Sequence, residues 1–207
     1  MASRAGAPVT MLTPWVPERG EAIAQAALRE WERGVQEPPL GRASDVRAYL
    51  RACGFGAAEA YSANGDAEWC GAFAGWCSLQ AGADPSVVRV KPDPEAGDFA
   101  STYRLMRLCA ANPARRITRA ADLRPGDVAV VGRVGRRAWG EHVVLVETPL
   151  TAGLIGTVEG NASGRLGAGR GSGEGVVRRS RLEVPTVSVR GFLFGVRLTP
   201  SDYIREV

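Results

Sequence analysis

The chain changes character at residues 124–127, Arg-Pro-Gly-Asp. Before this turn signal, apolar residues recur at the three- and four-residue spacing of amphipathic helices. After it, short runs rich in β-branched residues alternate with turn residues, which is typical of strands. Helices followed by strands predict an α+β fold, in which N-terminal helices pack on an antiparallel meander.

Four helices are predicted before the turn. In the second, Ser44 is the expected N-cap, and in the fourth Asp98 takes that role. The fourth helix should bury the face formed by Phe99, Tyr103, Met106 and Cys109. The predicted helices are Pro17 to Gly34, Ser44 to Gly54, the apolar run from Trp69 to Ala81, and the helix that follows Asp98.

Five strands are predicted after the turn, joined mostly by short links. A Gly-, Ser- and Arg-rich segment, 160–175, interrupts them. Its spacing fits no phosphate-binding loop, so we expect a mobile surface loop there. The predicted strands are Val128–Val131, His142–Thr148, Leu154–Glu159, Gly175–Arg179 and Val187–Leu198.

The length of 207 residues suits a single buried domain. We expect a flexible leader over 1–17, one domain over 18–199 that acts as a monomer, and a C-terminal tail over 200–207. The net charge of +4 is a mild basic bias without a dense Lys/Arg block, so no nucleic-acid partner is predicted.

No segment approaches the ~20 apolar residues of a membrane span, and residues 1–17 lack the apolar core of a signal peptide. We therefore expect no membrane span and no cleavable signal. Such a protein stays in the cytoplasm until it is released or exported by another route, or it is associated with a phage.

The four cysteines form no CxxC pair, which leaves zinc and redox motifs without support. Cys70 and Cys77 lie two helical turns apart, about 10 Å, which is beyond the reach of a disulfide. Cys53 and Cys109 fall on apolar helix faces and are expected to be buried thiols. No metal and no cofactor are predicted.

Cys70 stands out because it lies at the predicted start of a helix. The positive end of the helix dipole and the unpaired N–H groups of the first turn favour a thiolate. A catalytic thiolate needs a base, and His142 is the only histidine in the chain. The backbone N–H of Cys70 is also a natural oxyanion donor, and a second donor is expected within residues 61–68.

A third residue follows from the predicted hairpin, whose strands are joined by the loop 149–153. Pairing Thr148 with Leu154 in an antiparallel ladder places His142 opposite position 160, within one residue of register. Glu159 and Asn161 flank that position and should share a face. We expect Glu159 to orient His142, and Asn161 to be a second orienter or a substrate contact.

Two tryptophans, Trp69 and Trp139, precede the two catalytic candidates in the sequence. Both could line a groove for a sugar or a peptide, and both could equally serve as packing residues.

Several segments together resemble the CHAP domains (cysteine, histidine-dependent amidohydrolase/peptidase), relatives of the NlpC/P60 hydrolases. Glu68 to Phe73 resembles their cysteine motif, 123–128 their strand entry, 141–146 their histidine strand, and 158–161 their third-residue segment. Residues 34–37 and 46–50 resemble their helical lead-in. The resemblance runs from about residue 20 to 198.

The resemblance implies a papain-like fold and cleavage of amide bonds in peptidoglycan, between muramic acid and L-alanine or within the peptide stem and cross-bridge. Calcium occurs in some relatives, but this chain lacks a clustered acidic loop, and none is predicted. Three alternatives remain open at this point. They are a non-catalytic wall-binding module, a phage structural module, and a cytoplasmic cysteine amidohydrolase.

Overall fold

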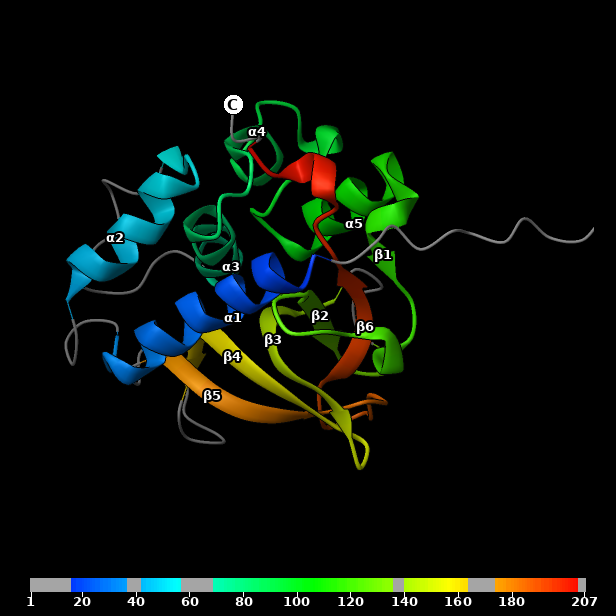
Figure 1. The fold of residues 1–207 in the computed structure, drawn as a ribbon. Coiled ribbons are helices and arrows are strands. Elements are labelled where there is room, and N and C mark those ends of the chain that lie inside the picture. Colours follow the sequence, from blue (N-terminus) through cyan, green and yellow to red (C-terminus); the bar gives the residue numbers. More distant parts are fainter. Residues whose placement is uncertain (1–15, 37–41, 57–68, 136–139, 164–173, 205–207) are drawn as a thin grey trace, which may run out of the picture.

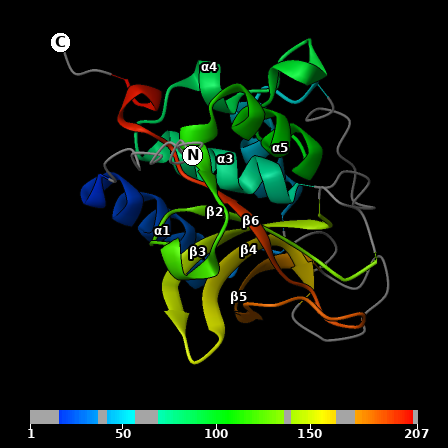
Figure 2. The same ribbon diagram turned by 90° about the vertical axis from the view of Figure 1, so that its right-hand side faces the viewer.

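A layer of helices covers one face of a curved, mostly antiparallel sheet (Figure 1). The protein is seen here in a computed structural model that describes residues 16–36, 42–56, 69–135, 140–163 and 174–204. Figure 2 shows the two layers edge-on, with the helices above the sheet. The predicted α+β class is confirmed.

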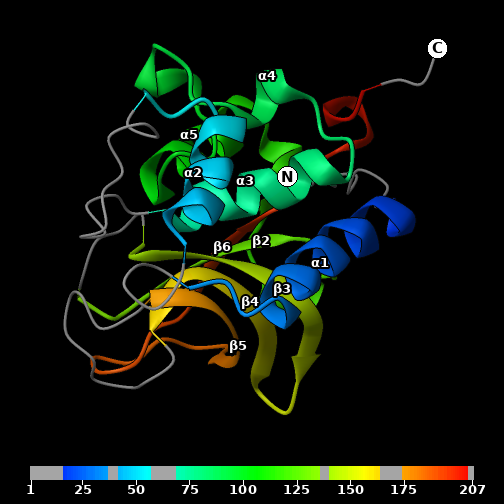
Figure 3. The ribbon, with the colours of Figure 1, turned by 90° about the vertical axis from the view of Figure 1, so that its left-hand side faces the viewer.

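Each predicted helix is present, and a short additional helix follows the third. Apolar helix α3 begins at Cys70, as the sequence predicts, and lies between α1 and α2 (Figure 3). The five α-helices are α1 (Pro17–Glu32), α2 (Ala43–Ala52), α3 (Cys70–Gln80), α4 (Pro85–Val88) and α5 (Thr102–Ala111). In the part of the chain that the structure describes, no helix is long and apolar enough to span a membrane.

Both predicted helix caps are wrong. Helix α2 begins one residue before Ser44, and its N-cap, Arg42, makes no side-chain capping bond. Helix α5 is capped by Ser101, whose hydroxyl accepts the N–H of Arg104. Asp98 is instead fully buried, where it accepts two backbone N–H groups and pairs with Arg104. A buried carboxylate needs several such partners, which a helix end alone does not supply.

The sheet contains the five predicted strands and one short strand, β1, that the sequence did not reveal. Its spatial order is β1-β6-β2-β3-β4-β5. The strands are β1 (Arg116–Ile117), β2 (Val128–Gly132), β3 (His142–Thr151), β4 (Leu154–Ser163), β5 (Glu174–Leu182) and β6 (Gly191–Val196).

The meander prediction holds for β2 to β5 and fails for β6. Strand β6 crosses to the opposite edge and pairs with β2 and β1. The sheet then curls far enough for β5 to meet β6 again, through a parallel pairing of Leu182 with Gly191. Residues 187–190, which the sequence assigned to the last strand, lie outside it.

The hairpin loop predicted at 149–153 is wrong, because β3 continues to Thr151. The turn is the two residues Ala152 and Gly153, both with positive φ (49° and 76°), as tight hairpin turns require. Near the site the ladder pairs Leu145 with Val158, a register one residue away from the predicted one.

The two faces of the sheet bury separate apolar clusters. Val143, Leu145 and Val158 pack against the helices together with Phe73 of α3. Val144, Val146 and Ile155 face the other way and pack within the curl of the sheet. Glu159 follows Val158 along β4, so its side chain lies on the opposite face, which points into the curl of the sheet.

The predicted C-terminal tail is wrong for residues 200–204, because they belong to the packed structure. Asp202 is 1% exposed and forms an ion pair with Arg115. Its carbonyl also accepts the N–H of Asp84, and Ala83 bridges to Tyr203. Most of the predicted leader, and residues 164–173 of the predicted loop, lie outside the described residues.

Gly160 allows β4 to approach the start of α3. A Cβ atom at this position would lie 2.6 Å from both Phe73 Cβ and Trp69 Cζ3. These distances are far shorter than van der Waals contact, so the strand and the helix would have to separate. The absence of a side chain at Gly160 thus allows β4, which carries Glu159, to pack closely against α3, which carries Cys70.

We predict that Gly160→Ala destabilises the protein by about 1–3 kcal/mol, because overpacking forces the backbone to shift. Chemical denaturation measures the change. Gly56→Ala is the matched control, since a Cβ there meets nothing within 4 Å. Equal midpoints for the two variants would contradict the close packing described for Gly160.

Candidate active site

Cys70 is the first residue of α3, and its side chain reaches the surface at only 9% exposure. The first helical hydrogen bond runs from Phe73 N–H to Trp69 O. The N–H groups of residues 70–72 therefore lie in the first turn of the helix, ahead of this first helical hydrogen bond. This is the position in which a thiolate, or an oxyanion formed next to it, is stabilised.

His142 opens β3 and is 5% exposed. The chain enters this strand through Gly140, whose φ of 89° favours glycine. Next to it, the N–H of Glu141 donates to Val131 O of the neighbouring strand at 2.8 Å. The imidazole is thus anchored by a strand start on rigid sheet rather than by a loop.

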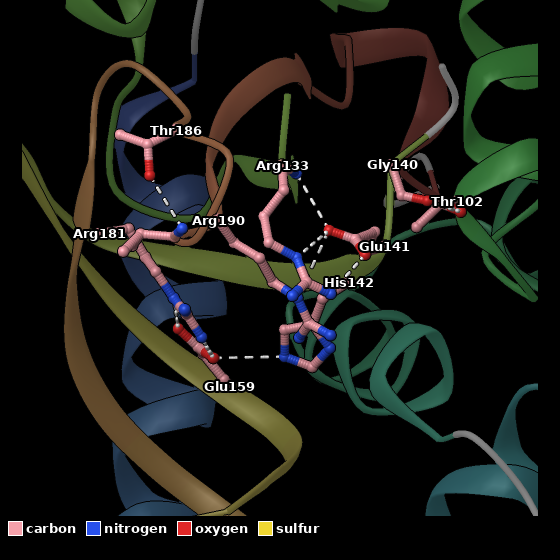
Figure 4. Close-up of polar contacts among 10 residues, drawn as sticks. Thr102, Arg133, Gly140, Glu141, His142, Glu159, Arg181, Thr186 and Arg190 are labelled. Atoms are coloured by element: carbon pink, nitrogen blue, oxygen red, sulfur yellow. Dashed lines mark hydrogen bonds and ion pairs between the residues drawn. The ribbon is translucent and has the colours of Figure 1, made fainter. Parts of the chain in front are cut away.

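Glu159 of β4 is fully buried and lies next to the histidine (Figure 4). His142 Nε2 is 3.2 Å from Glu159 Oε2, which is ion-pair distance, although the angle falls outside that of a hydrogen bond. Catalytic contacts of this kind often tighten only when substrate binds. With Nε2 on the Glu159 side, Nδ1 is the nitrogen left for Cys70.

The charge state of His142 depends on both neighbours. Burial would lower the pKa of the imidazole, but the polar interactions with Cys70 and Glu159 outweigh burial and raise the pKa to about 9. The charged form is thereby favoured at neutral pH. Because the folded pKa lies above the ordinary 6.5, this contribution to stability is complete below pH 6.5 and is lost as pH rises to about 9.

Arg181 of β5 is a site residue that sequence reasoning missed. Its Nε donates to Glu159 Oε1 at 2.6 Å, and its Nη2 donates to Oε2 (Figure 4). Burial would raise the pKa of Glu159, but His142 and Arg181 together hold it well below its usual range. The predicted strand ended at Arg179. Extending that prediction by two residues would have placed Arg181 on the strand next to Glu159.

Asn161 occupies a β-bulge next to Glu159 and has a φ of 57°. Glu159 pairs with Val177 and Ala162 with Gly175, so two residues of β4 face one of β5. Glu159 and Ala162 consequently share a face. The prediction that Glu159 and Asn161 share one is wrong, because simple alternation stops at the bulge. Asn161, whose backbone has a left-handed conformation beside the site, remains a candidate substrate contact.

The two tryptophans have different outcomes. Trp69 is fully buried and its ring stacks on Tyr49, with centroids 5.8 Å apart. The structure thus gives Trp69 the packing role that the sequence left open, in place of a groove-lining one. Trp139 and the oxyanion donor expected within residues 61–68 lie outside the described residues.

Cys53 and Cys109 are buried free thiols, as predicted, and Cys77 is also buried and outside any disulfide. Burial raises the pKa of the Cys53 thiol to about 12 and that of Cys109 to about 11. The pKa of Cys77 is raised for the same reason. Among the described residues, no cluster of three or more His, Cys, Asp or Glu side chains could hold a metal ion.

Comparison of the chain with protein-family models, curated proteins and solved structures found no match. A thiol at a helix start, a buried imidazole with a raised pKa and an ionised carboxylate are the groups from which a nucleophile, a base and an orienting group can be built.

His142 gives a direct test of these contacts, because its imidazole signals are the only ones of their kind in the NMR spectrum. We predict that they titrate near pH 9 in the wild type. Glu159→Gln removes the carboxylate that favours the imidazolium, so the pKa should fall. A wild-type midpoint at the ordinary value of a free histidine would contradict the described contacts.

Thiol labelling gives a second test. We predict that iodoacetamide at pH 7 modifies Cys70 alone in the folded protein, because the other three thiols are at most 1% exposed. Peptide mass spectrometry identifies the site, and unfolded protein, in which all four cysteines react, is the control. Labelling of Cys53, Cys77 or Cys109 at a comparable rate would contradict the prediction.

Proposed function

We propose that this protein is a papain-like cysteine hydrolase that cleaves amide bonds. One observation carries the proposal, which is the position of His142 between the Cys70 thiol and the buried Glu159 carboxylate. A site that moves a proton between a nucleophile and a leaving group uses a nucleophile, a base and an orienting carboxylate in this order.

In the acylation step, the Cys70 thiolate attacks the carbonyl carbon of the scissile amide. A C–S bond forms and the carbonyl electrons move onto oxygen, next to the N–H groups at the start of α3. The His142 imidazolium then gives its proton to the amide nitrogen. The C–N bond breaks, the amine leaves, and a thioester to Cys70 remains.

In the deacylation step, a water molecule replaces the amine. Neutral His142 removes a proton from this water as its oxygen attacks the thioester carbon. The C–S bond breaks and a carboxylic acid is released, which restores the thiolate–imidazolium pair. Throughout both steps Glu159 keeps Nε2 of His142 in place and stabilises the positive ring.

For the substrate, we propose the amide bonds of bacterial peptidoglycan. The resemblance of segments 68–73, 141–146 and 158–161 to CHAP domains supports this choice. The net charge of +4 is compatible with an anionic cell wall. We further propose that the domain acts as a monomer, with all three catalytic groups supplied by one chain.

We predict that Cys70→Ala and Cys70→Ser abolish release of soluble fragments from purified cell walls. Removing the nucleophile leaves no covalent route, and losses of 10³-fold or more are typical of such sites. Mass spectrometry of the fragments identifies the bond that is cut.

Cys109→Ala is the control, because it removes another buried thiol, which lies in the core face of α5. This variant should retain activity. Equal activity of wild type and Cys70→Ala would overturn the catalytic assignment. Wall binding without any release would favour a binding module, and activity only on soluble small amides would overturn the choice of peptidoglycan.

A further inference from the structure

The carboxylate of Glu159 has almost all of its acceptor positions filled. A carboxylate offers about four lone-pair positions. Arg181 occupies one on each oxygen, and Thr157 Oγ1 donates to Oε1 at 2.7 Å. The position that remains is on Oε2, the oxygen that lies 3.2 Å from His142 Nε2.

We propose that Arg181 is a positioning residue that acts through Glu159, by fixing the direction in which the carboxylate presents its last free lone pair to His142. The proposal rests on the proposed function for its catalytic consequence. Its structural content concerns only the described contacts among these three side chains.

The geometry of Arg181 suits this role. A guanidinium that donates Nε and Nη2 to two oxygens of one carboxylate holds it in a single plane, which a point charge does not do. The Arg181 side chain is 11% exposed and that of Glu159 is fully buried, so water screens their contact weakly. His142 itself makes a misaligned contact, so it does not set the carboxylate direction.

The origin of Arg181 in the fold also matters. Arg181 lies on β5 opposite Ile155, and it shares a face of the sheet with Thr157 and Glu159 through the pleat of the paired strands. The next residue, Leu182, makes the parallel pairing that closes β5 against β6. The position of Arg181 is thus fixed where the curl of the sheet closes.

The arrangement assigns Glu159 an orienting role and excludes a proton-accepting one. Two guanidinium hydrogen bonds and one hydroxyl hydrogen bond all favour the ionised carboxylate. The proton on His142 therefore moves between Cys70, the leaving amine and water, and it does not pass to Glu159. The side-chain hydrogen bonds that Arg181 makes with the described residues go to this carboxylate, so a loss of Arg181 should change kcat rather than KM.

Arg178 provides a matched control on the same strand. It makes the same two-oxygen contact, with Glu147, but on the opposite face of the sheet and with a side chain that is 48% exposed. Arg178→Lys therefore removes the same kind of two-oxygen contact on the face of the sheet that does not carry Glu159. Any effect that it shares with a variant of Arg181 reflects the stability of β5 alone.

The test uses two substrate-free readouts, the NMR titration of His142 and the rate of Cys70 alkylation at pH 7. Arg181→Lys keeps the charge but loses the planar fork, so the pKa of His142 should fall and alkylation should slow about tenfold, within the range that misplacement of a catalytic group produces. Arg181→Gln is measured alongside, so that a folding failure of one variant leaves the other decisive.

A double-mutant cycle isolates the route of action. If Arg181 acts through Glu159, then in a Glu159→Gln background Arg181→Lys should cause no further change in either readout. Unchanged readouts in folded Arg181 variants, effects matched by Arg178→Lys, or additive effects in the cycle would each overturn the proposal. If the wild-type protein releases no fragments from cell walls, the proposed function is contradicted. The NMR titration and the alkylation rate need no substrate, so they still test the role of Arg181.

Discussion

The buried carboxylate of Glu159 is the constraint on which the site depends. A fully buried charge is tolerated only with paired partners, and this one is held between Arg181 and His142. The two partners come from β5 and β3, on either side of β4. The ion pairs therefore tie three adjacent strands together at the end of the sheet where α3 begins.

Packing on the other face of the sheet sets the distance between the two halves of the site. Strand β4 approaches the first turn of α3 because Gly160 has no side chain to separate it from Phe73 and Trp69. His142 and Glu159 come from the sheet, and Cys70 comes from the helical layer. Stability and the proposed catalysis thus rely on the same contact between the two layers.

Much of this arrangement could be predicted from local patterns. The hydrophobic periods located the helices and most strands, and the helix start at Cys70 was correct. The predictions that failed were those that depend on contacts between segments far apart in the sequence. The bulge at Asn161 and the return of β6 to β2 depend on which strands meet, and single strands carry no such information. Asp98 was misassigned as a cap because burial, rather than propensity, decided its partners, whereas Ser44 failed because α2 begins one residue earlier, at Ala43.

The sequence by itself determined the candidate nucleophile and base, because one histidine and one cysteine at a helix start left few alternatives. It also determined the helix-then-strand order and placed Glu159 within one residue of its observed register. Only the tertiary structure decided that Glu159 is buried and that Arg181 holds it. An arginine on a predicted strand looks the same whether it faces water or a carboxylate, and only the pairing of β5 with β4, which places Arg181 and Glu159 on one face of the sheet, distinguishes the two.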